Sequence, residues 1–323
     1  MAGSVGEFSC SVIWLLSDLT RVDAPMRLYV YTMRAMMVSL LSERIAGASL
    51  AVRQGLAVEV LASTPSTNAE LRARVANLQS PLLLVTDIQT AGRGRAGRSW
   101  RSAPGDSLCF SLAWRFQGTL ARLSGLSLAV GVAVAEALRA QGWPVQLKWP
   151  NDLLLEGAKL GGILIETAAR ASDDGVWAVI GVGLNVHANA ERDAVLGDAV
   201  TALSEVAREN VAGAAHNEID HIDRNLLLAS IADTLSVAMH AFDQHGLQPF
   251  VPRWHGLHEH QNCAVMLIEN GQLLHEGVAR GIDDQGCLLL DTAAGRVAIT
   301  AGDVSLRRGQ NSNHSGALHA AAD

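Results

Sequence analysis

The sequence lacks the cysteine patterns that mark disulfide scaffolds and zinc modules. Its 323 residues include four cysteines, none of which forms a CxxC pair or combines with histidines at zinc-finger spacing. We therefore expect reduced thiols in a cytoplasmic protein. The four are Cys10, Cys109, Cys263 and Cys287.

Long apolar runs are also missing. The stretch from Val12 to Leu16 is followed by charged residues, and the stretch from Leu28 to Leu41 is interrupted by Arg34. Both are shorter than the roughly 18 uninterrupted residues that a membrane span needs. No small-residue cleavage pattern follows a basic start, so we expect neither a secretory signal nor a membrane partner.

Positive charge is in deficit, with 25 Lys and Arg against 32 Asp and Glu and a formal net charge of −7. Neutralising phosphates needs a net basic face, so this balance argues against a general nucleic-acid binder. Hydrophobic residues make up 49% of the chain, enough to build the core of one large domain and a small second one.

Periodicity predicts an α+β fold with a mixed or antiparallel central sheet. Thr67 to Glu70 has capping-box spacing and starts a helix. Further helices are expected at 124–141 and 225–245. Short turns join several of the expected strands, which favours antiparallel neighbours over βαβ units. The strands are expected at 82–86, 108–114 (with one apolar face), 145–149, 153–155, 159–167 and 176–186, with a tight turn at 173–175.

These patterns divide the chain into four parts. Residues 1–48 show no clean period and are treated as an N-terminal extension of unknown role. The main domain is expected at 49–260, with loops and short helix at 190–222. Short strands separated by glycine turns predict a small β-barrel at 261–308, and the polar composition of 309–323 predicts a disordered tail.

The most informative segment is the run Gly92-Arg93-Gly94-Arg95-Ala96-Gly97-Arg98-Ser99-Trp100. Its glycines let the backbone approach a ligand closely, and its arginines supply forked donors for phosphate and carboxylate oxygens. No Lys-Ser/Thr pair follows, so it is not a Walker loop. A solvated surface loop or an RGG-like RNA segment is the competing interpretation, but RGG segments are usually long and repetitive.

A second segment joins Lys148-Trp149-Pro150-Asn151-Asp152 to the strand from Lys159 to Glu166. Lysine is rarely buried without a partner, so Lys159, at the start of an apolar strand beside two glycines, suits an anionic ligand. A strand-edge lysine and a plain Pro-Asn-Asp turn are the alternatives.

Two weaker segments are Ser66-Thr67-Asn68, at the expected helix start, and Gly181-Val182-Gly183-Leu184-Asn185, at a strand end. Exposed N–H groups and hydroxyls at a helix start can hold a polar ligand, although such residues more often only cap the helix. The glycine-flanked Asn185 offers an amide to a base or phosphate.

In this order, the four segments resemble the biotin protein ligase family, with similarity from about Val60 to Arg307. The resemblance implies a class II synthetase-like ligase core and an SH3-like C-terminal domain. It also implies formation of biotinyl-5'-AMP from biotin and ATP with Mg²⁺, followed by transfer to a lysine of a biotin carboxyl carrier protein domain. No covalent enzyme intermediate is needed, and whether the protein itself binds a metal is left open.

The resemblance also implies roles for individual residues. Ser66, Thr67 and Gln89 would bind the ureido head of biotin, Arg93 and Lys159 its carboxylate, and Arg95 and Arg98 the phosphates. Trp100 would shape the nucleotide wall, and Arg280 would reach the ATP side from the small domain. The full biotin set is Ser66, Thr67, Asn68, Gln89, Gly92, Arg93, Lys159 and Gly162; the ATP set is Arg95, Arg98, Trp100, Asn151, Asp152 and Asn185; the catalytic set is Arg95, Lys159 and Asp152.

Three alternatives stay open. A lipoate-type acyl-protein ligase shares the fold and the adenylate chemistry. A biotin-responsive DNA-binding regulator would need a winged helix-turn-helix, for which too few residues precede Ser66, so we expect a ligase without DNA binding. An RNA-binding module lacks interleaved aromatics near the loop. A homodimer through an edge strand is not decided by the sequence.

Overall fold

The computed structural model describes residues 39–169, 175–189, 200–206, 222–269, 272–300 and 304–308. The expected extension up to residue 38, the tail 309–323, most of 190–222 and most of the turn at 173–175 lie outside the described residues.

A seven-stranded sheet forms the centre of the larger domain, in the order β1-β2-β5-β9-β8-β7-β6. Its first two strands run parallel, and every other neighbouring pair is antiparallel, which confirms the predicted mixed sheet. The strands are β1 (Ala57–Thr64), β2 (Leu82–Gln89), β5 (Ser107–Gln117), β6 (Gln146–Lys148), β7 (Asp152–Leu155), β8 (Ala158–Ala169) and β9 (Gly175–Asn185).

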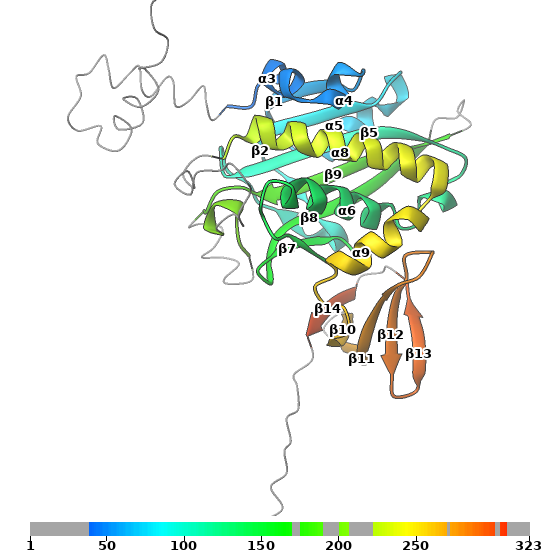
Figure 1. Ribbon diagram of the computed structural model, residues 1–323. Helices are drawn as coiled ribbons and strands as arrows, with labels where there is room; N and C mark the ends of the chain where they lie inside the picture. The colour runs from blue at the N-terminus through cyan, green and yellow to red at the C-terminus, as the bar shows by residue number, and fades with distance from the viewer. Residues whose placement is uncertain are drawn as a thin grey trace, which may run out of the picture.

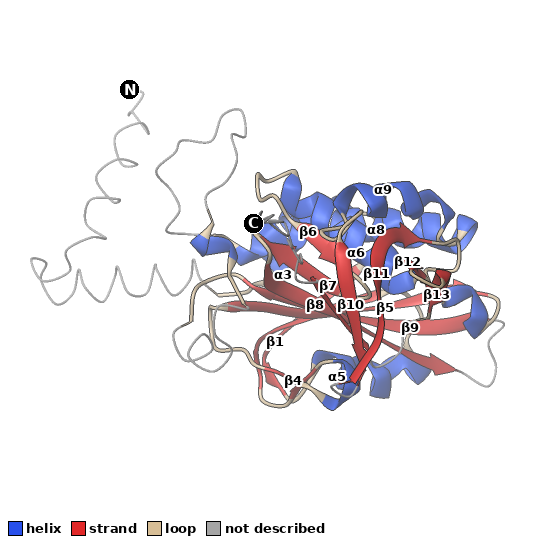
Figure 2. Cartoon of the chain, turned by 90° about the horizontal axis from the view of Figure 1, so that it is seen from below, coloured by secondary structure: helices blue, strands red, loops and turns tan. Residues whose placement is uncertain are grey.

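Helices cover both faces of this sheet. Helices α6 (Leu126–Arg139) and α8 (Arg224–His245) lie across one face with α9 (Val251–Leu257), while α5 (Thr67–Arg74) lies on the other (Figures 1 and 2). All three predicted helices are therefore present. Short 3₁₀ turns are η2 (Val75–Asn77), η4 (Leu120–Leu123), η6 (Leu203–Glu205) and η7 (Gln248–Phe250).

Two of these helical segments, Leu120–Arg139 and Arg224–His245, are long and apolar enough to cross a membrane by length and composition. In the fold, 56% of each apolar window is buried inside the protein. Both segments contribute buried residues to the core that they share with the sheet.

Strand β5 differs from its prediction. We expected one apolar face, but its residues from Ser107 to Trp114 are all buried. The strand is central in the sheet, with α8 on one side and α5 on the other, so Cys109 and Ser111 are as inaccessible as the apolar residues between them. Ser111 lies under α5, where it contacts Thr67 and Asn68, and Cys109 lies under Trp100, so neither faces water.

The predicted start of the main domain at residue 49 is wrong. Leu40 and Ile45 belong to the main core, and α3 (Ser42–Ala48) packs against α8. The Leu41 amide donates to Asn225 Oδ1 at 2.8 Å, and Ser49, which caps α4 (Leu50–Arg53), donates to Asp233 at 2.6 Å. The fold therefore includes the residues described before position 49.

The C-terminal domain is a five-stranded antiparallel sheet in the order β13-β12-β11-β10-β14. It contacts the larger domain beside the Lys148–Asp152 segment: Trp149 Nε1 donates to the Gly286 carbonyl at 3.1 Å, and Ser124 Oγ donates to the Gln285 carbonyl at 2.7 Å. The strands are β10 (Ala264–Glu269), β11 (Gln272–Ile282), β12 (Leu288–Thr292), β13 (Gly295–Ile299) and β14 (Val304–Arg308).

Candidate active site

A cavity of about 260 Å³ lies between the central sheet and the glycine- and arginine-rich segment Gly92–Trp100, which we call the flap. The flap consists of β3 (Gly92–Arg93), a 3₁₀ turn η3 (Arg95–Gly97) and β4 (Ser99–Trp100). Residues from α5, the flap, β7, β8, β9 and the small domain, which contributes Leu306, all line this cavity.

The flap is a tight hairpin that needs its glycines. The Gly94 amide donates to the Arg98 carbonyl at 2.7 Å, and Ala96 and Gly97 take positive φ angles of 55° and 70°. At Gly92, which pairs with Trp100, a Cβ atom would lie 2.5 Å from the Trp100 carbonyl oxygen. The backbone therefore folds back on itself more closely than side chains allow.

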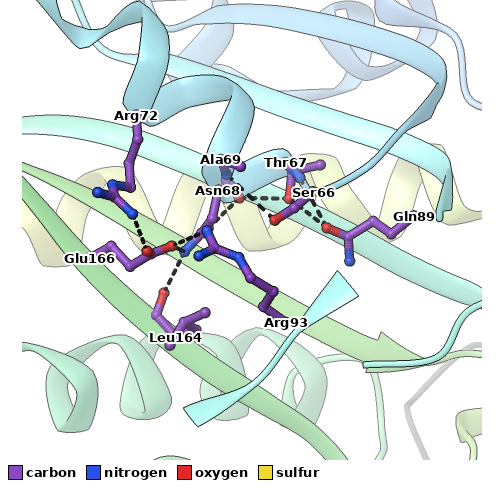
Figure 3. Close-up of polar contacts among 10 residues, drawn as sticks. Ser66, Thr67, Asn68, Ala69, Arg72, Gln89, Arg93, Leu164 and Glu166 are labelled. Atoms are coloured by element: carbon purple, nitrogen blue, oxygen red, sulfur yellow. Dashed lines mark hydrogen bonds and ion pairs between the residues drawn. The ribbon is translucent and has the colours of Figure 1, made fainter. Parts of the chain in front are cut away.

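One end of the cavity is polar and carries no net charge. Ser66 caps α5 by accepting from the Ala69 amide at 3.4 Å, and the Thr67 amide donates to Gln89 Oε1 at 3.0 Å (Figure 3). Ser66 and Thr67 are buried, as is Asn68. This end suits a neutral ligand with both donors and acceptors.

The flap arginine nearest this end points to a carboxylate of the protein. Arg93 donates to Glu166 Oε2 at 2.8 Å, and Arg72 of α5 approaches the other oxygen at 2.6 Å (Figure 3). Asn68 also donates to Glu166, at 2.9 Å. Arg93 therefore has a carboxylate partner within the protein, and its contact with a biotin carboxylate stays a prediction.

The other end of the cavity is cationic. Lys159 Nζ lies 2.6 Å from Asp152 Oδ1, and Arg95 donates to Asn151 Oδ1 at 3.2 Å. Arg95 and Lys159 come from the flap and from β8, and both line the same cavity. Lys148 and Lys159 are the two lysines of the sequence, and Lys148 lines the cavity too.

Bare glycine positions on β9 form the wall between the two ends. A Cβ atom at Gly181 would lie 2.3 Å from Asn68 Oδ1, and one at Gly183 would lie 2.5 Å from the Trp100 ring. Asn185, at the end of the strand, donates to the Thr201 carbonyl at 3.0 Å, while its buried Oδ1 has no hydrogen-bond partner among the described residues. A buried acceptor of this kind is costly unless a ligand donates to it.

Cys109 lies beneath the flap. Burial raises the pKa of this thiol to about 11, and the side chains of Trp100, Ser102 and Gln89 contact it. The thiol is therefore protonated at neutral pH, and the thiolate is the nucleophilic form.

Most of the sequence-predicted site residues come together in this cavity. Gly92 does not line the cavity and acts through the hairpin geometry of the flap. Arg280 does not line it either: it donates to Asp291 Oδ2 at 2.7 Å and to Asn262 Oδ1 at 2.9 Å. The structure thus places Arg280 outside this cavity, and its role on the ATP side stays a prediction. Lining residues that the prediction did not assign include Lys148, Ser99, Arg101, Gly181, Gly183 and Leu306.

Comparisons with known proteins agree with this geometry. The Biotin/lipoate A/B protein ligase family matches residues 58–185, and the Biotin protein ligase C terminal domain matches residues 261–307. The Bifunctional ligase/repressor BirA of Escherichia coli (strain K12) is 37% identical over 254 residues, which cover 78% of this chain and 75% of that protein.

Two further matches cover nearly the whole of the known protein. The Biotin--[acetyl-CoA-carboxylase] ligase of Mycobacterium tuberculosis is 34% identical over 82% of this chain and 93% of its own. The biotin protein ligase from Aquifex aeolicus, solved in complex with biotin and ATP, has a TM-score of 0.63 and 28% identity, with 78% of this chain and 99% of that chain covered. The chain therefore belongs to the biotin protein ligase family.

Proposed function

We propose that this chain forms biotinyl-5'-AMP from biotin and ATP and transfers the biotin to a lysine of an acceptor protein. The observation that carries the proposal is the single cavity with a neutral polar end at Thr67 and Gln89 and a cationic end at Arg95 and Lys159. Biotin has a neutral ureido head and an anionic carboxylate, so it matches both ends in one orientation.

In the first step, a carboxylate oxygen of biotin attacks the α-phosphorus of ATP, and pyrophosphate leaves. Both reactants are anionic and repel each other unless positive charge lies between them. Lys159 and Arg95 supply that charge from opposite walls of the cavity. Preorganised donors of this kind contribute roughly 10²–10³ each to the rate.

In the second step, the amine of the acceptor lysine attacks the acyl carbon of the mixed anhydride, and AMP leaves. The amine must arrive neutral and lose a proton after attack. Among the described residues, Asp152 is the acidic side chain that lines the cavity, and its Oδ1 already accepts from Lys159 at 2.6 Å. It orients the incoming amine or takes its proton.

Mg²⁺ enters this proposal with ATP. In the described part of the chain, no group of three or more His, Cys, Asp or Glu side chains is placed to hold a metal. The residues fit an ion held mainly by phosphate oxygens, with Asp152 as one protein ligand. Bound there, Mg²⁺ would neutralise charge on the departing pyrophosphate.

The remaining expectations are proposals of the same kind. The acceptor is the carrier domain of a carboxylase, since the relatives from Mycobacterium tuberculosis and Paracoccus denitrificans are named as acetyl-CoA-carboxylase ligases. We place the reaction in the cytoplasm and expect no specific binding to biotin operator DNA in a gel shift. Sedimentation with and without biotin tests for a homodimer.

Biotin-dependent ATP–pyrophosphate exchange tests the function, with lipoate as the competing substrate. We expect exchange with biotin only, and a fall of about 10²–10³-fold in Lys159→Ala and Arg95→Ala. Arg122→Ala, on the surface away from the cavity, is the matched control and should retain the wild-type rate. Equal exchange with lipoate, or full activity in Lys159→Ala, would contradict the proposal.

A further inference from the structure

Glu166 lies outside the cavity but joins three segments that border it. Its side chain is 17% exposed and receives donors from Arg72 on α5, Arg93 on the flap and Asn68 at the start of α5 (Figure 3). Glu166 itself sits on β8, the strand that also carries Lys159. One carboxylate thus connects the flap to the neutral end of the cavity.

The contacts of Glu166 fix the orientation of the Asn68 amide. Asn68 Nδ2 faces two groups that can only accept, Glu166 Oε2 at 2.9 Å and the Leu164 carbonyl at 3.2 Å. Its Oδ1 must therefore face Ser111 Oγ, which lies 2.6 Å away. Because Asn68 also packs on the bare backbone of Gly181, the amide has little room to turn.

The orientation of the Asn68 amide also decides which hydroxyl donates in the hydrogen bond between Ser111 and Thr67. Ser111 has one hydroxyl hydrogen, and Asn68 Oδ1 can only accept it. The Thr67 hydroxyl lies 2.7 Å from Ser111 Oγ and 3.3 Å from Gln89 Oε1, which already accepts from the Thr67 amide. We therefore assign the Thr67 hydrogen to Ser111. The Thr67 oxygen then keeps a lone pair for the cavity, where it can accept an N–H group. All three side chains are buried, so a reversed arrangement would leave unpaired polar atoms.

We propose that Glu166 is a positioning residue that sets the donor direction at the biotin end and closes the flap over it through Arg93. This inference rests on the proposed function, because it names biotin as the ligand of that end. Arg93 then serves to hold the flap, while Arg95 and Lys159 face the reacting anions.

Steady-state kinetics of Glu166→Gln separate positioning from chemistry. The amide that this change introduces would point an NH₂ group at a guanidinium and weaken the hold on Arg93. We expect the KM for biotin in pyrophosphate exchange to rise about 10–100-fold. The KM for ATP and the kcat at saturating biotin should stay within about threefold, because Arg95 keeps its contact with Asn151 and Trp100 keeps its packing on Gly183. Glu166→Asp, which keeps the carboxylate, should recover part of the loss.

Arg72→Ala is the matched control. It removes an ion pair from the same carboxylate without touching the flap or Asn68. The contacts of Arg93 and Asn68 with Glu166 therefore remain. Its KM for biotin should change less than about threefold. Arg93→Ala should reproduce most of the Glu166→Gln effect, and the double variant should add little to either, because both lose the same contact.

The Cys109 thiol gives a readout that needs no turnover. In a chain with Cys10, Cys263 and Cys287 replaced by serine, its rate of reaction with a maleimide reports opening of the flap above it. Biotin should slow the reaction in the wild type and in Arg72→Ala, but not in Glu166→Gln or Arg93→Ala. Equal protection by biotin in all four proteins, or an equal rise of the KM values for biotin and ATP in Glu166→Gln, would overturn the proposal.

The two proposals can fail separately. If the wild type shows no biotin-dependent exchange and no protection of Cys109 by biotin, the proposed function is wrong. If the wild type is active and protected while Glu166→Gln matches it in both measurements, only the role of Glu166 is wrong. A thermal unfolding curve for each variant shows whether a lost activity reflects lost folding.

Discussion

The contact of Trp100 with Gly183 allows a sharp test of how the sheet positions the flap. Gly183→Ala would place a methyl carbon 2.5, 2.7 and 2.9 Å from Cε2, Cζ2 and Cδ2 of the Trp100 ring. Carbon atoms normally pack about 3.5–4.0 Å apart, so the rigid indole must withdraw by roughly 1 Å. Since Trp100 is part of β4, which pairs with β3 through Gly92, the flap moves with the ring.

A displacement of about 1 Å in a positioning element costs on the order of 10²-fold in rate, and overpacking costs about 1–3 kcal/mol of stability. We therefore expect kcat/KM for ATP in pyrophosphate exchange to fall about 10²-fold in Gly183→Ala, with a lower Tm. In a Trp100→Ala background the same change should add less than about threefold, because the clash is gone. Gly256→Ala, with no atom within 4 Å, is the control. Equal losses in both backgrounds would refute this reasoning.

Three further predictions use other features of the site and core. Asp152→Ala should slow transfer from preformed biotinyl-AMP about 10²-fold or more, and a nearly unchanged rate would exclude a role for Asp152 with the amine. Burial lowers the pKa of His258 from 6.5 to about 3, so between these values the unfolded chain binds a proton that the folded chain does not. As the pH falls, the free energy of unfolding should therefore fall more steeply in the wild type than in His258→Leu, by up to about 1.4 kcal/mol per pH unit. Urea unfolding of both proteins at pH 7 and pH 5 measures this, and an equal change in the two proteins would contradict the prediction. Burial raises the Cys109 pKa to about 11, so by mass spectrometry Cys109 should be alkylated after Cys263 at pH 8.

Local patterns predicted much of the fold. The capping box at Thr67, the apolar stripe of Arg224–His245 and the short turns between strands depend on neighbours in sequence, and each appears in the structure. The start of the domain and the burial of both β5 faces depend on distant packing. Nothing near Ile45 in sequence shows that α8, some 180 residues later, covers it.

The site divides in the same way. Glycine and arginine spacing identified the flap and the Lys159 strand, because close backbone approach and forked donors restrict which residues fit. No role was assigned to Ser111 or Glu166 from the sequence, because their partners lie far along the chain. Ser111 is 43 residues from its partner Asn68, and Glu166 is 98 residues from the same asparagine. A buried serine in an apolar strand was the one available signal for Ser111.

The carboxylate partner of Arg93 shows which property the sequence leaves undetermined. Charge counts alone give the flap three cations, yet Arg93 lies against Glu166, while Arg95 lies against Asn151 in the cavity that Lys159 also lines. If Arg93 faced the cavity without this carboxylate, both ends would attract an anion, and a ligand with one neutral and one anionic end could bind in either direction. Pairing with Glu166 offsets the charge of Arg93 where it lines the cavity, whereas Arg95 lies against the neutral amide of Asn151. In the proposed function the carboxylate of biotin is therefore drawn towards the end with Arg95 and Lys159, where the α-phosphate must also lie.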